Sequence, residues 1–359
     1  MKVLVTGAAG FIGSHVVDAL RARAADVLGI DSLDPGVHRI LPSYLRSDVD
    51  YCFADLRYWQ PDSRFEDVEV VVHLAALGGV SRAAREPANI IAANCLGTAR
   101  LAEFARRWPR LIKVVVCSSF SVYGGNYTYV CRSCQTRTSS LRKTADLAKG
   151  IYEVTCHQCG AETDIQPITA EACPAPLETY GASKYMQELC FCGFEHCPVN
   201  VLRFSSVYGN RLRLEDGEAT IIARLVAWIR SGCRPRLFED GRQIRDWVHV
   251  QDVVDAILAV VDAASAPPII NVCSGIPTRL LEACEQISRA VQIPCRPEIV
   301  GSYRPGDMRH CLGDSVPLQE LIGRRPISLA EGAALAFSET PNADHSIRSF
   351  SGAVASQTL

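Results

Sequence analysis

The sequence predicts an α/β fold built on a doubly wound parallel sheet, followed by a smaller C-terminal α/β domain. Short, continuously apolar runs alternate with stretches of helical periodicity over the first third of the chain, as in KVLVTG (2–7) and KVVVCSS (113–119). Strands without polar alternation are typical of a parallel sheet covered on both faces. A glycine-rich turn follows the first strand, and a cysteine-rich insertion at 126–170 interrupts the rhythm.

Each element is predicted from its own pattern. We expect a helix over 11–23, because Ile12, Val16, Ala19 and Leu20 recur at helical spacing, and a helical segment around 90–107. The other strands of the first third are expected at 27–31, 51–56 and 68–76. Beyond the insertion we expect helices at about 180–193, 218–232, 251–263 and 279–291, and strands at 200–204 and 269–273.

The charge distribution and the short apolar runs favour a cytoplasmic protein that binds neither nucleic acid nor membranes. The 359 residues carry a formal net charge of −2, and no long basic run is interleaved with aromatic residues. No stretch reaches the roughly 18 apolar residues of a membrane span, and the N-terminal apolar run is too short for a secretory signal. Sixteen cysteines in a reducing compartment should be mostly small buried residues, with closely spaced pairs as candidate metal ligands.

The turn TGAAGFIG is a candidate dinucleotide site. It places Gly7, Gly10 and Gly13 between the first strand and the first helix, with Phe11 and Ile12 at the helix start. Glycines at this spacing allow a tight turn, close approach of the backbone to a pyrophosphate, and access to free amides of the helix N-terminus. Such turns also serve packing, but the position at the first strand favours binding and makes the predicted fold a Rossmann type.

Two carboxylates follow the next strands. Asp31 ends the second strand, where a carboxylate can bind an adenosine ribose and would repel a 2′-phosphate, which favours NAD over NADP. The alternative is a solvated residue at a strand end. Asp55 and Leu56 close the third predicted strand and could flank the adenine, although an incidental position explains them nearly as well.

The segment YGASK supplies Tyr180 and Lys184, which lie on one face of a helix at i and i+4 spacing. A free tyrosine has a pKa of about 10 and is a poor base near neutral pH. An adjacent ammonium should stabilise the phenolate and lower that pKa. The spacing alone occurs by chance on many helices. Together with the glycine turn and a strand that ends in Ser118 and Ser119, it predicts a catalytic site.

The insertion contains two Cys-x-x-Cys pairs, Cys131 with Cys134 and Cys156 with Cys159, separated by 21 residues. This spacing fits a tetrahedral four-cysteine zinc site of ribbon type, and the zinc would be structural because four thiolates leave no open position. The insertion has little apolar content, so metal ligation is expected to supply its folding free energy. Disulfides or free thiols are the alternatives.

With these motifs, the chain resembles the extended short-chain dehydrogenase/reductases, specifically their nucleotide-sugar epimerase/dehydratase group. The motifs span residues 1 to about 335: TGAAGFIGSH, HLAA (73–76), NCLGT (94–98), SSFSVYG (118–124), YGASK (180–184), RFSSVYGNR (203–211) and GRQIRDWVHVQD (241–252). The segments DSLDPGVH, FEDGRQIRDWVHVQD and YRPGDMRH look like the dTDP-L-rhamnose 4-epimerase branch, whose members also carry a Cys-rich insertion, with UDP-glucose 4-epimerase-like members also similar.

The resemblance implies roles for single residues. It makes Tyr180 the catalytic base, Lys184 its partner and Ser119 the hydroxyl that hydrogen-bonds the reacting group. Tyr180 and Lys184 also belong to the implied NAD site. Its other members outside the glycine turn are Asp31, Asp55, Leu56, Leu74, Ala75, Ala76 and Asn94.

On the substrate side, Arg245 and Arg304 match arginines that grip the nucleotide diphosphate, with Asp307 nearby. One departure concerns Ser206, which stands where relatives commonly have an asparagine that contacts the sugar diphosphate. Serine is shorter and cannot reproduce both of those contacts.

The implied reaction is NAD-dependent inversion at C4 of a nucleotide-diphosphate sugar through a transient 4-keto sugar. Relatives that eliminate water, decarboxylate, or epimerise and reduce place an Asp-Glu pair, a Glu or a Cys after the serine, whereas Phe120 and Ser121 follow here. The alternatives are a 2-epimerase or a 4-ketoreductase, and a dinucleotide sensor without catalysis. Tyr180 and Lys184 argue against the sensor, because such proteins typically lose one of them.

The domain organisation follows from these motifs. The NAD-binding domain is expected to comprise 1–125 and 171–205 with a segment near 246–272, the zinc-ribbon-like insertion 126–170, and the nucleotide-sugar-binding domain 206–245 and 273–338. The small and polar residues 340–359 predict a disordered tail. Relatives often dimerise through helices around 94–107 and 180–193, which implies a homodimer. Because the insertion leaves just after Ser119 and returns before Tyr180, we expect it to form a rim or lid on the sugar side.

Overall fold

The centre of the molecule is a seven-stranded parallel sheet in the order β13-β9-β5-β4-β1-β2-β3, which confirms the predicted fold. The structure, a computed structural model, describes residues 1–139, 141–214 and 220–338. The predicted tail at 340–359 lies outside the described residues. The strands are β1 (Lys2–Thr6), β2 (Asp26–Asp31), β3 (Asp50–Phe53), β4 (Val70–His73), β5 (Lys113–Ser119), β9 (Val199–Phe204) and β13 (Ile269–Val272).

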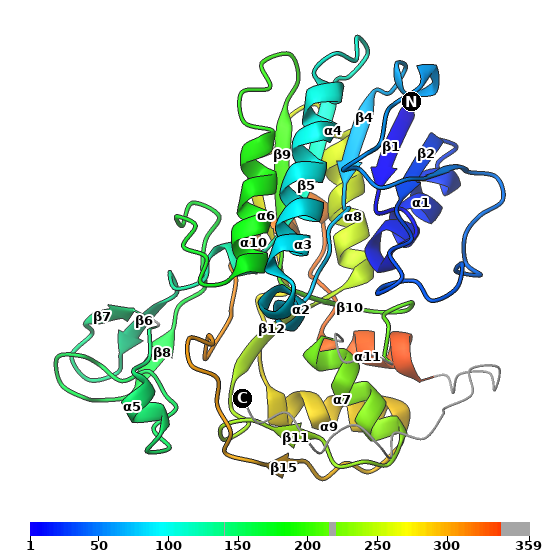
Figure 1. Cartoon of the computed structure of the whole chain (residues 1–359). Coiled ribbons are helices and arrows are strands. Elements are labelled where there is room, and N and C mark those ends of the chain that lie inside the picture. Colours follow the sequence, from blue (N-terminus) through cyan, green and yellow to red (C-terminus); the bar gives the residue numbers. More distant parts are fainter. Residues whose placement is uncertain (140, 215–219, 339–359) are drawn as a thin grey trace.

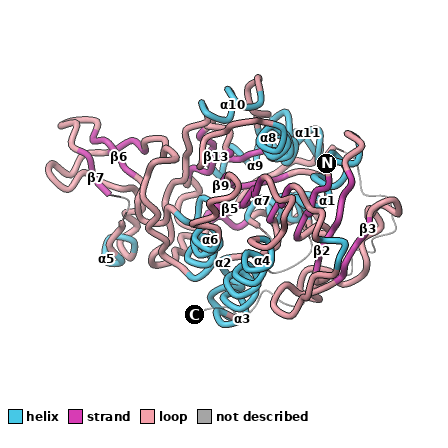
Figure 2. The backbone as a smooth tube through the Cα atoms, turned by 90° about the horizontal axis from the view of Figure 1, so that it is seen from above, coloured by secondary structure: helices cyan, strands magenta, loops and turns pink. Residues whose placement is uncertain are grey.

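Helices cover both faces of the sheet, which explains why its strands are apolar throughout (Figure 2). Val3 and Val5 pack into the core beneath one set of helices, while Leu4, between them, points into the core beneath the other set. The first face carries α1 (Phe11–Ala22), α8 (Val250–Asp262) and α10 (Val316–Ile322). The second carries α2 (Val80–Arg85), α3 (Pro87–Ile91), α4 (Gly97–Ala105) and α6 (Thr179–Cys190).

Several elements end earlier than predicted. Strand β4 ends at His73 and β3 at Phe53, so Leu74–Ala76 and Asp55–Leu56 lie in loops at the carboxyl edge of the sheet. The segment expected as one helix near 90–107 comprises α3, a π-helical turn (Ala92–Leu96) and α4. Ligand sites of such sheets lie at the carboxyl ends of the strands, so these loops surround the candidate site.

A smaller lobe lies below the sheet (Figure 1). Its core contains Trp247, Leu225 and Ile287, all fully buried. Helix α7 begins after the cap Thr220, and the first part of the helix expected from 218 lies outside the described residues. The lobe comprises α7 (Ile221–Arg230), α9 (Leu280–Val291), α11 (Leu329–Phe337), the sheet of β10 (Ser206–Tyr208), β12 (Ile244–His249) and β14 (Pro277–Arg279), and the pair β11 (Arg236–Leu237) and β15 (Glu298–Ile299).

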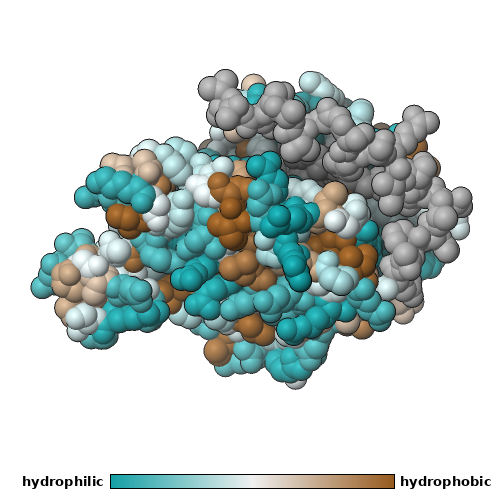
Figure 3. Space-filling model, turned by 90° about the horizontal axis from the view of Figure 1, so that it is seen from below, coloured by the Kyte–Doolittle hydropathy of each residue, from teal (hydrophilic) through white to brown (hydrophobic). Residues whose placement is uncertain are grey.

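The insertion forms its own three-stranded antiparallel sheet and projects from the side of the molecule (Figure 1). Seen from below, it reaches out to the left and shows mostly hydrophilic side chains (Figure 3). Its base contributes more apolar burial than the sequence suggested, because Tyr127, Tyr129 and Ile168 pack with Phe120 of the main body. Its elements are β6 (Thr128–Cys131), β7 (Arg137–Ser139), α5 (Thr144–Leu147) and β8 (Thr163–Ile165).

Within the described ranges, no helix combines the length and the apolar character that crossing a membrane requires.

Candidate active site

The glycine turn between β1 and α1 presents backbone amides to a cavity. Helix α1 has Gly10 as its cap and no side-chain cap, and its first hydrogen bond runs from the amide of Ser14 to the carbonyl of Gly10 (3.0 Å). The amides of Phe11 and Ile12 therefore precede the helical ladder, as in sites for phosphate groups. Gly13 must be glycine, because a Cβ there would lie 2.0 Å from the carbonyl oxygen of Gly7.

A cavity of about 430 Å³ opens beside this turn. It contains most of the predicted cofactor residues, and among them only Asn94, Tyr180 and Lys184 lie outside its lining. The predicted residues that line it are Gly7, Gly10, Phe11, Ile12, Gly13, Asp31, Asp55, Leu56, Leu74, Ala75 and Ala76. The fold thus brings together residues from the ends of four strands.

Asp31 is a fixed carboxylate at the edge of the cavity and not a solvated residue. It is 8% exposed and accepts hydrogen bonds from the amides of Ala9 (3.0 Å) and Leu33 (2.8 Å). A carboxylate has further acceptor capacity beyond these two bonds, so it can still bind a ribose hydroxyl. Asp55 lies on the same cavity and is paired with Arg57, whose Nη2 is 2.6 Å from its Oδ2.

Several cavity residues were missed by sequence reasoning. The Tyr44 hydroxyl donates to the carbonyl of Ala9 (2.9 Å), and Arg82 pairs with Asp34 (3.1 Å). Further lining comes from His38, Arg211 and Arg213. Arg82 belongs to the short helix α2 and the others lie on loops. No periodic pattern marks them, and only the tertiary fold brings them to the cavity. For Arg211, its place at the end of RFSSVYGNR was the only signal.

Tyr180 stands at the start of α6, where the Glu178 carboxylate caps the amides of Tyr180 (2.6 Å) and Gly181 (2.7 Å). Its side chain packs against a small apolar cluster with Leu77 and Ala93, and both of these residues also line the cavity. Burial raises the pKa of Tyr180 to about 12, the Glu178 charge acts in the same direction, and a hydrogen bond with Ser119 acts against them.

The Lys184 charge, which the sequence led us to expect as a cause of a lowered Tyr180 pKa, is not among the groups that shift this pKa in the structure. The Lys184 ammonium is buried and donates to Oε1 of Gln187, and burial lowers its own pKa to about 8. Gln187 in turn donates to the carbonyl of Ala75 (3.0 Å) and to the hydroxyl of Thr98 (2.8 Å). Lys184 is thereby tied to the loop that lines the cavity.

Asn94 connects the same loop to α6. Its Oδ1 accepts from the amide of Leu77 (2.7 Å), and its Nδ2 donates to the carbonyl of Leu77 (3.0 Å) and to the hydroxyl of Ser183 (2.9 Å). Ser183 directly precedes Lys184. Asn94 is fully buried, so its observed contacts position the cavity loop and the helix with Tyr180 relative to each other.

The predicted substrate residues Ser206, Arg245, Arg304 and Asp307 do not line the main cavity, and they belong to the lower lobe. The Arg245 guanidinium donates to the carbonyls of Arg309 (3.0 Å) and Met308 (3.4 Å). Arg304 lies over the ring of Phe238, and Ser206 stands at the start of β10. Asp307 lines a second, small cavity of about 30 Å³ together with Leu177, Leu141 and Arg142, the last two from the insertion.

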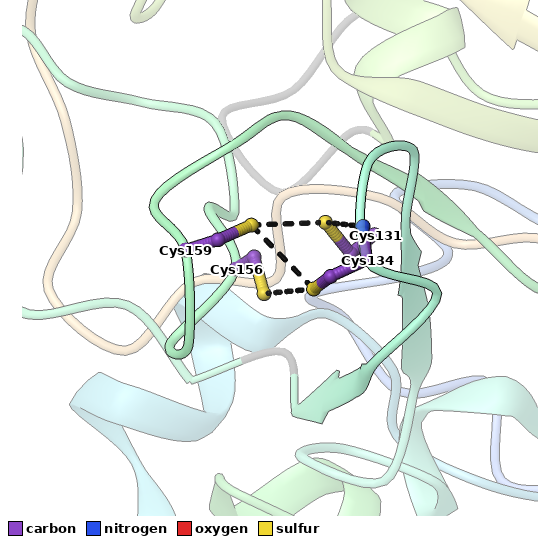
Figure 4. Close-up of side chains that lie close together, drawn as sticks. All are labelled: Cys131, Cys134, Cys156 and Cys159. Carbon is purple, nitrogen blue, oxygen red and sulfur yellow. Dashed lines mark hydrogen bonds between the residues drawn. The ribbon is translucent and has the colours of Figure 1, made fainter.

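The four cysteines of the insertion converge as a metal site requires (Figure 4). Their sulfur atoms all lie within 4.8 Å of one another, and Cys131 to Cys159 is 3.4 Å. Tetrahedral zinc with Zn–S bonds of about 2.3 Å places sulfurs about 3.8 Å apart, so the arrangement fits. The amides of Ser133 and Cys134 also point at the Cys131 sulfur (3.4 Å each), which favours a thiolate.

Disulfide bonds, the alternative left open by the sequence, are not formed. All sixteen cysteines lie within the described residues, and none of them is paired in a disulfide.

The chain is similar in sequence to a known family and to several characterised enzymes. The family model described as the NAD dependent epimerase/dehydratase family matches residues 3–145 and 130–273. The UDP-glucose 4-epimerase of Mycolicibacterium smegmatis is 32% identical, over 93% of this chain and 96% of its own. The dTDP-L-rhamnose 4-epimerase of Burkholderia thailandensis is 28% identical, over 90% of each chain.

Solved structures give the same result. The UDP-glucose 4-epimerase of Thermotoga maritima, solved with UDP-glucose, has a TM-score of 0.73 and 27% identity, with 94% of this chain and 97% of that chain covered. The UDP-glucose 4-epimerase of Thermus thermophilus, solved in complex with NAD, has a TM-score of 0.71 and 25% identity, with 94% and 98% covered.

Proposed function

Because the chain belongs to the NAD dependent epimerase/dehydratase family, we propose that it is an NAD-dependent nucleotide-sugar 4-epimerase. The observation that carries the proposal is the position of Tyr180. It packs against the small apolar cluster that includes Leu77 of the glycine-turn cavity, and the Ser119 hydroxyl acts to lower its pKa. A proton-transferring phenol is thus placed beside a cavity suited to a dinucleotide.

The polar groups that line the cavity, and the close backbone approach at its glycine turn, are suited to NAD. The cavity combines the amides at the start of α1, the close approach permitted by Gly13, and the fixed Asp31 carboxylate, which favours a free ribose hydroxyl over a 2′-phosphate. When bound, NAD supplies reversible hydride transfer at a carbinol carbon.

The residues of the chain supply the proton chemistry. Tyr180 takes the proton of the sugar C4 hydroxyl and returns it after the keto sugar has turned over, while Ser119 hydrogen-bonds the same oxygen. Since burial raises the pKa of Tyr180, the phenolate needs a nearby positive charge. Lys184, one turn further along α6, is the cation that this helix offers.

The residue after Ser119 supports simple inversion over elimination. Phe120 is buried and packs edge-on against Tyr123, so the position that holds an acid or base in dehydrating relatives carries a hydrocarbon ring. We further propose that the lower lobe holds the nucleotide diphosphate through Arg245 and Arg304, with Ser206 and Asp307 nearby.

Two further assignments belong to this proposal. The four converging cysteines hold a structural zinc ion, and the chain forms a homodimer through α3–α4 and α6. The dimer is supported by four apolar side chains on these adjacent helices, each at least 41% exposed: Ile91, Leu96, Met186 and Leu189.

The experiment that tests the function is a substrate screen. The purified protein is incubated with dTDP-L-rhamnose, UDP-glucose, UDP-GlcNAc, UDP-glucuronate and dTDP-glucose, and the epimers are separated by chromatography. We expect one C4 epimer pair to interconvert without net reduction of NAD, and the Tyr180→Phe variant to be slower by about 10²–10⁴-fold.

Ser206, which replaces the usual asparagine of relatives, gives a second candidate some weight: a 2-epimerase or 4-ketoreductase with a different sugar pose. Inversion at C2, or consumption of added NADH, would identify these activities. A screen that yields no product from any of the five sugars would contradict the leading proposal.

A further inference from the structure

A buried arginine of the lower lobe is held partly by the insertion. Arg309 has no solvent exposure, and its guanidinium donates to Glu239 (2.6 Å) and Asp240 (2.9 Å) of its own lobe. A third carboxylate comes from the insertion, since Nη2 of Arg309 also donates to Glu153 (2.5 Å). Removing one partner from such a buried ionic group is costly, because it leaves charge without compensation.

Arg142 makes a second connection between the two parts. From the insertion, it donates to Oε1 of Glu239 (2.9 Å) and to the backbone carbonyl of Asp307 (2.8 Å). Both charged side chains are nearly buried, with 5% of Arg142 and 3% of Glu239 exposed. Glu239 therefore lies between an arginine of the insertion and Arg309 of its own lobe.

His310 extends the contact to strand β12. Its Nδ1 accepts a hydrogen bond from the amide of Ile244 (2.9 Å), so the proton resides on Nε2, which donates to Glu153 (2.9 Å). Partial burial acts to raise the pKa of Glu153, but the hydrogen bonds from His310 and Arg309 outweigh it and lower the value to about 2. Glu153 is therefore an anion at every working pH.

The segment held in this way also places Arg245. The Arg245 guanidinium donates to the carbonyls of Met308 and Arg309, and Arg245 follows Ile244, whose amide binds His310. The same segment contains Asp307 and begins with Arg304. Both arginines proposed to hold the nucleotide diphosphate, and the nearby Asp307, thus lie on, or are bonded to, backbone that the insertion fixes.

We propose that Arg142 and Glu153 are positioning residues for the nucleotide-sugar site, which they order by holding the segment 304–310. This inference rests on the proposed function, because it assumes that Arg245 and Arg304 bind the nucleotide diphosphate. The insertion then stabilises the position of this segment in the lower lobe. No described residue of the insertion lines the glycine-turn cavity, which should be unaffected.

The test compares Glu153→Gln with a matched control, Glu162→Gln, in the purified full-length protein. Glu162 also pairs with an arginine, Arg132 (2.6 Å), but both lie within the insertion and are exposed. Calorimetry with UDP and dTDP measures diphosphate binding, and steady-state kinetics with the sugar found in the screen separate KM from kcat. Arg142→Gln serves as a second variant, and a thermal melt verifies that each variant is folded.

For Glu153→Gln and Arg142→Gln we expect Kd and KM to rise by about three- to thirtyfold, with kcat and NAD content unchanged. The control should match the parent protein. Parent-like Kd and KM in both variants, or an equal loss in Glu162→Gln, would overturn the inference while the function stands. Parent protein that binds neither nucleotide and converts no sugar would overturn both.

Discussion

At the scale of single residues, the Lys184 ammonium donates its hydrogen bond to Gln187 and not to the proposed base Tyr180. The sequence places an ammonium one turn from Tyr180, but the structure gives that ammonium to Gln187. Gln187 also reaches the cavity loop through the carbonyl of Ala75 (3.0 Å). Side-chain direction on a helix follows from spacing, whereas the choice among neighbouring acceptors depends on the packed fold. The i and i+4 motif therefore predicted the pair of residues but not the hydrogen-bond partner of the lysine.

A buried histidine on the same network gives a prediction about stability. His73 is 1% exposed and hydrogen-bonds the hydroxyls of Thr6 (2.7 Å) and Thr98 (2.8 Å). Burial, with a smaller contribution from the Lys184 charge, lowers its pKa to about 3. The unfolded chain, with a histidine pKa of about 6.5, binds more protons between these values, so stability is lost as pH falls below about 6.5.

We expect the free energy of unfolding to fall by about 1.7 kcal/mol between pH 6.5 and pH 5 on account of His73 alone, because the unfolded histidine is half protonated at pH 6.5 and the slope approaches about 1.4 kcal/mol per pH unit only at lower pH. Urea unfolding at the two pH values measures this loss. In the His73→Gln variant the pH-dependent loss should shrink by that amount, even if the variant is less stable throughout. An unchanged pH dependence in the variant would show that His73 is not the titrating group.

At the scale of elements, the glycine between Tyr180 and Lys184 sets the approach of α6 to the end of β5. A Cβ on Gly181 would lie 2.4 Å from the carbonyl oxygen of Ser121 and 3.0 Å from the capping carboxylate of Glu178. The helix start therefore rests directly on the turn that follows Ser119. The sequence shows this glycine only as one letter of YGASK, and the contact that requires it joins residues 60 positions apart.

Gly181→Ala should move Tyr180 away from Ser119 and lower kcat by about a hundredfold, because a displacement near 1 Å is enough for a loss of that size. NAD content should be unchanged, since Gly181 does not line the glycine-turn cavity. Epimerisation kinetics and the bound NAD after denaturation measure the two effects. Ala182→Ser, an exposed change at the next position, is the control. Full activity of Gly181→Ala would contradict the contact.

Most strands and helices could be predicted, while their ends could not. Apolar runs located every strand of the main sheet, but β4 stops at His73 although the apolar pattern continues. There the chain turns because the amide of Ala75 bonds the hydroxyl of Thr6 (3.2 Å) and Leu77 bonds Asn94. Such side-chain contacts between distant segments leave no periodic signal, and they are what shapes the candidate site.

At the scale of the whole molecule, the sequence predicted the insertion and its four cysteines but not its attachment. Cys-x-x-Cys pairs are local signals, so their convergence could be anticipated. The ion pairs of Arg142 and Glu153 with the lower lobe join residues about a hundred positions or more apart, and single charged residues carry no mark of their partners. The rim or lid expected from topology remains a prediction, supported by Leu141 and Arg142 at the second cavity.

Removal of the proposed zinc should destabilise the insertion without unfolding the seven-stranded sheet. We expect one zinc per chain by atomic emission, and its loss in Cys159→Ser, whereas Cys173→Ser, at an exposed cysteine outside the cluster, should retain it. Hydrogen exchange should then speed up in β6–β8 around the cluster, because metal ligation orders this part. The seven-stranded sheet should keep its protection, since none of the residues described for the insertion belongs to its two apolar cores. Global unfolding of Cys159→Ser, or unchanged exchange in the insertion, would contradict this division.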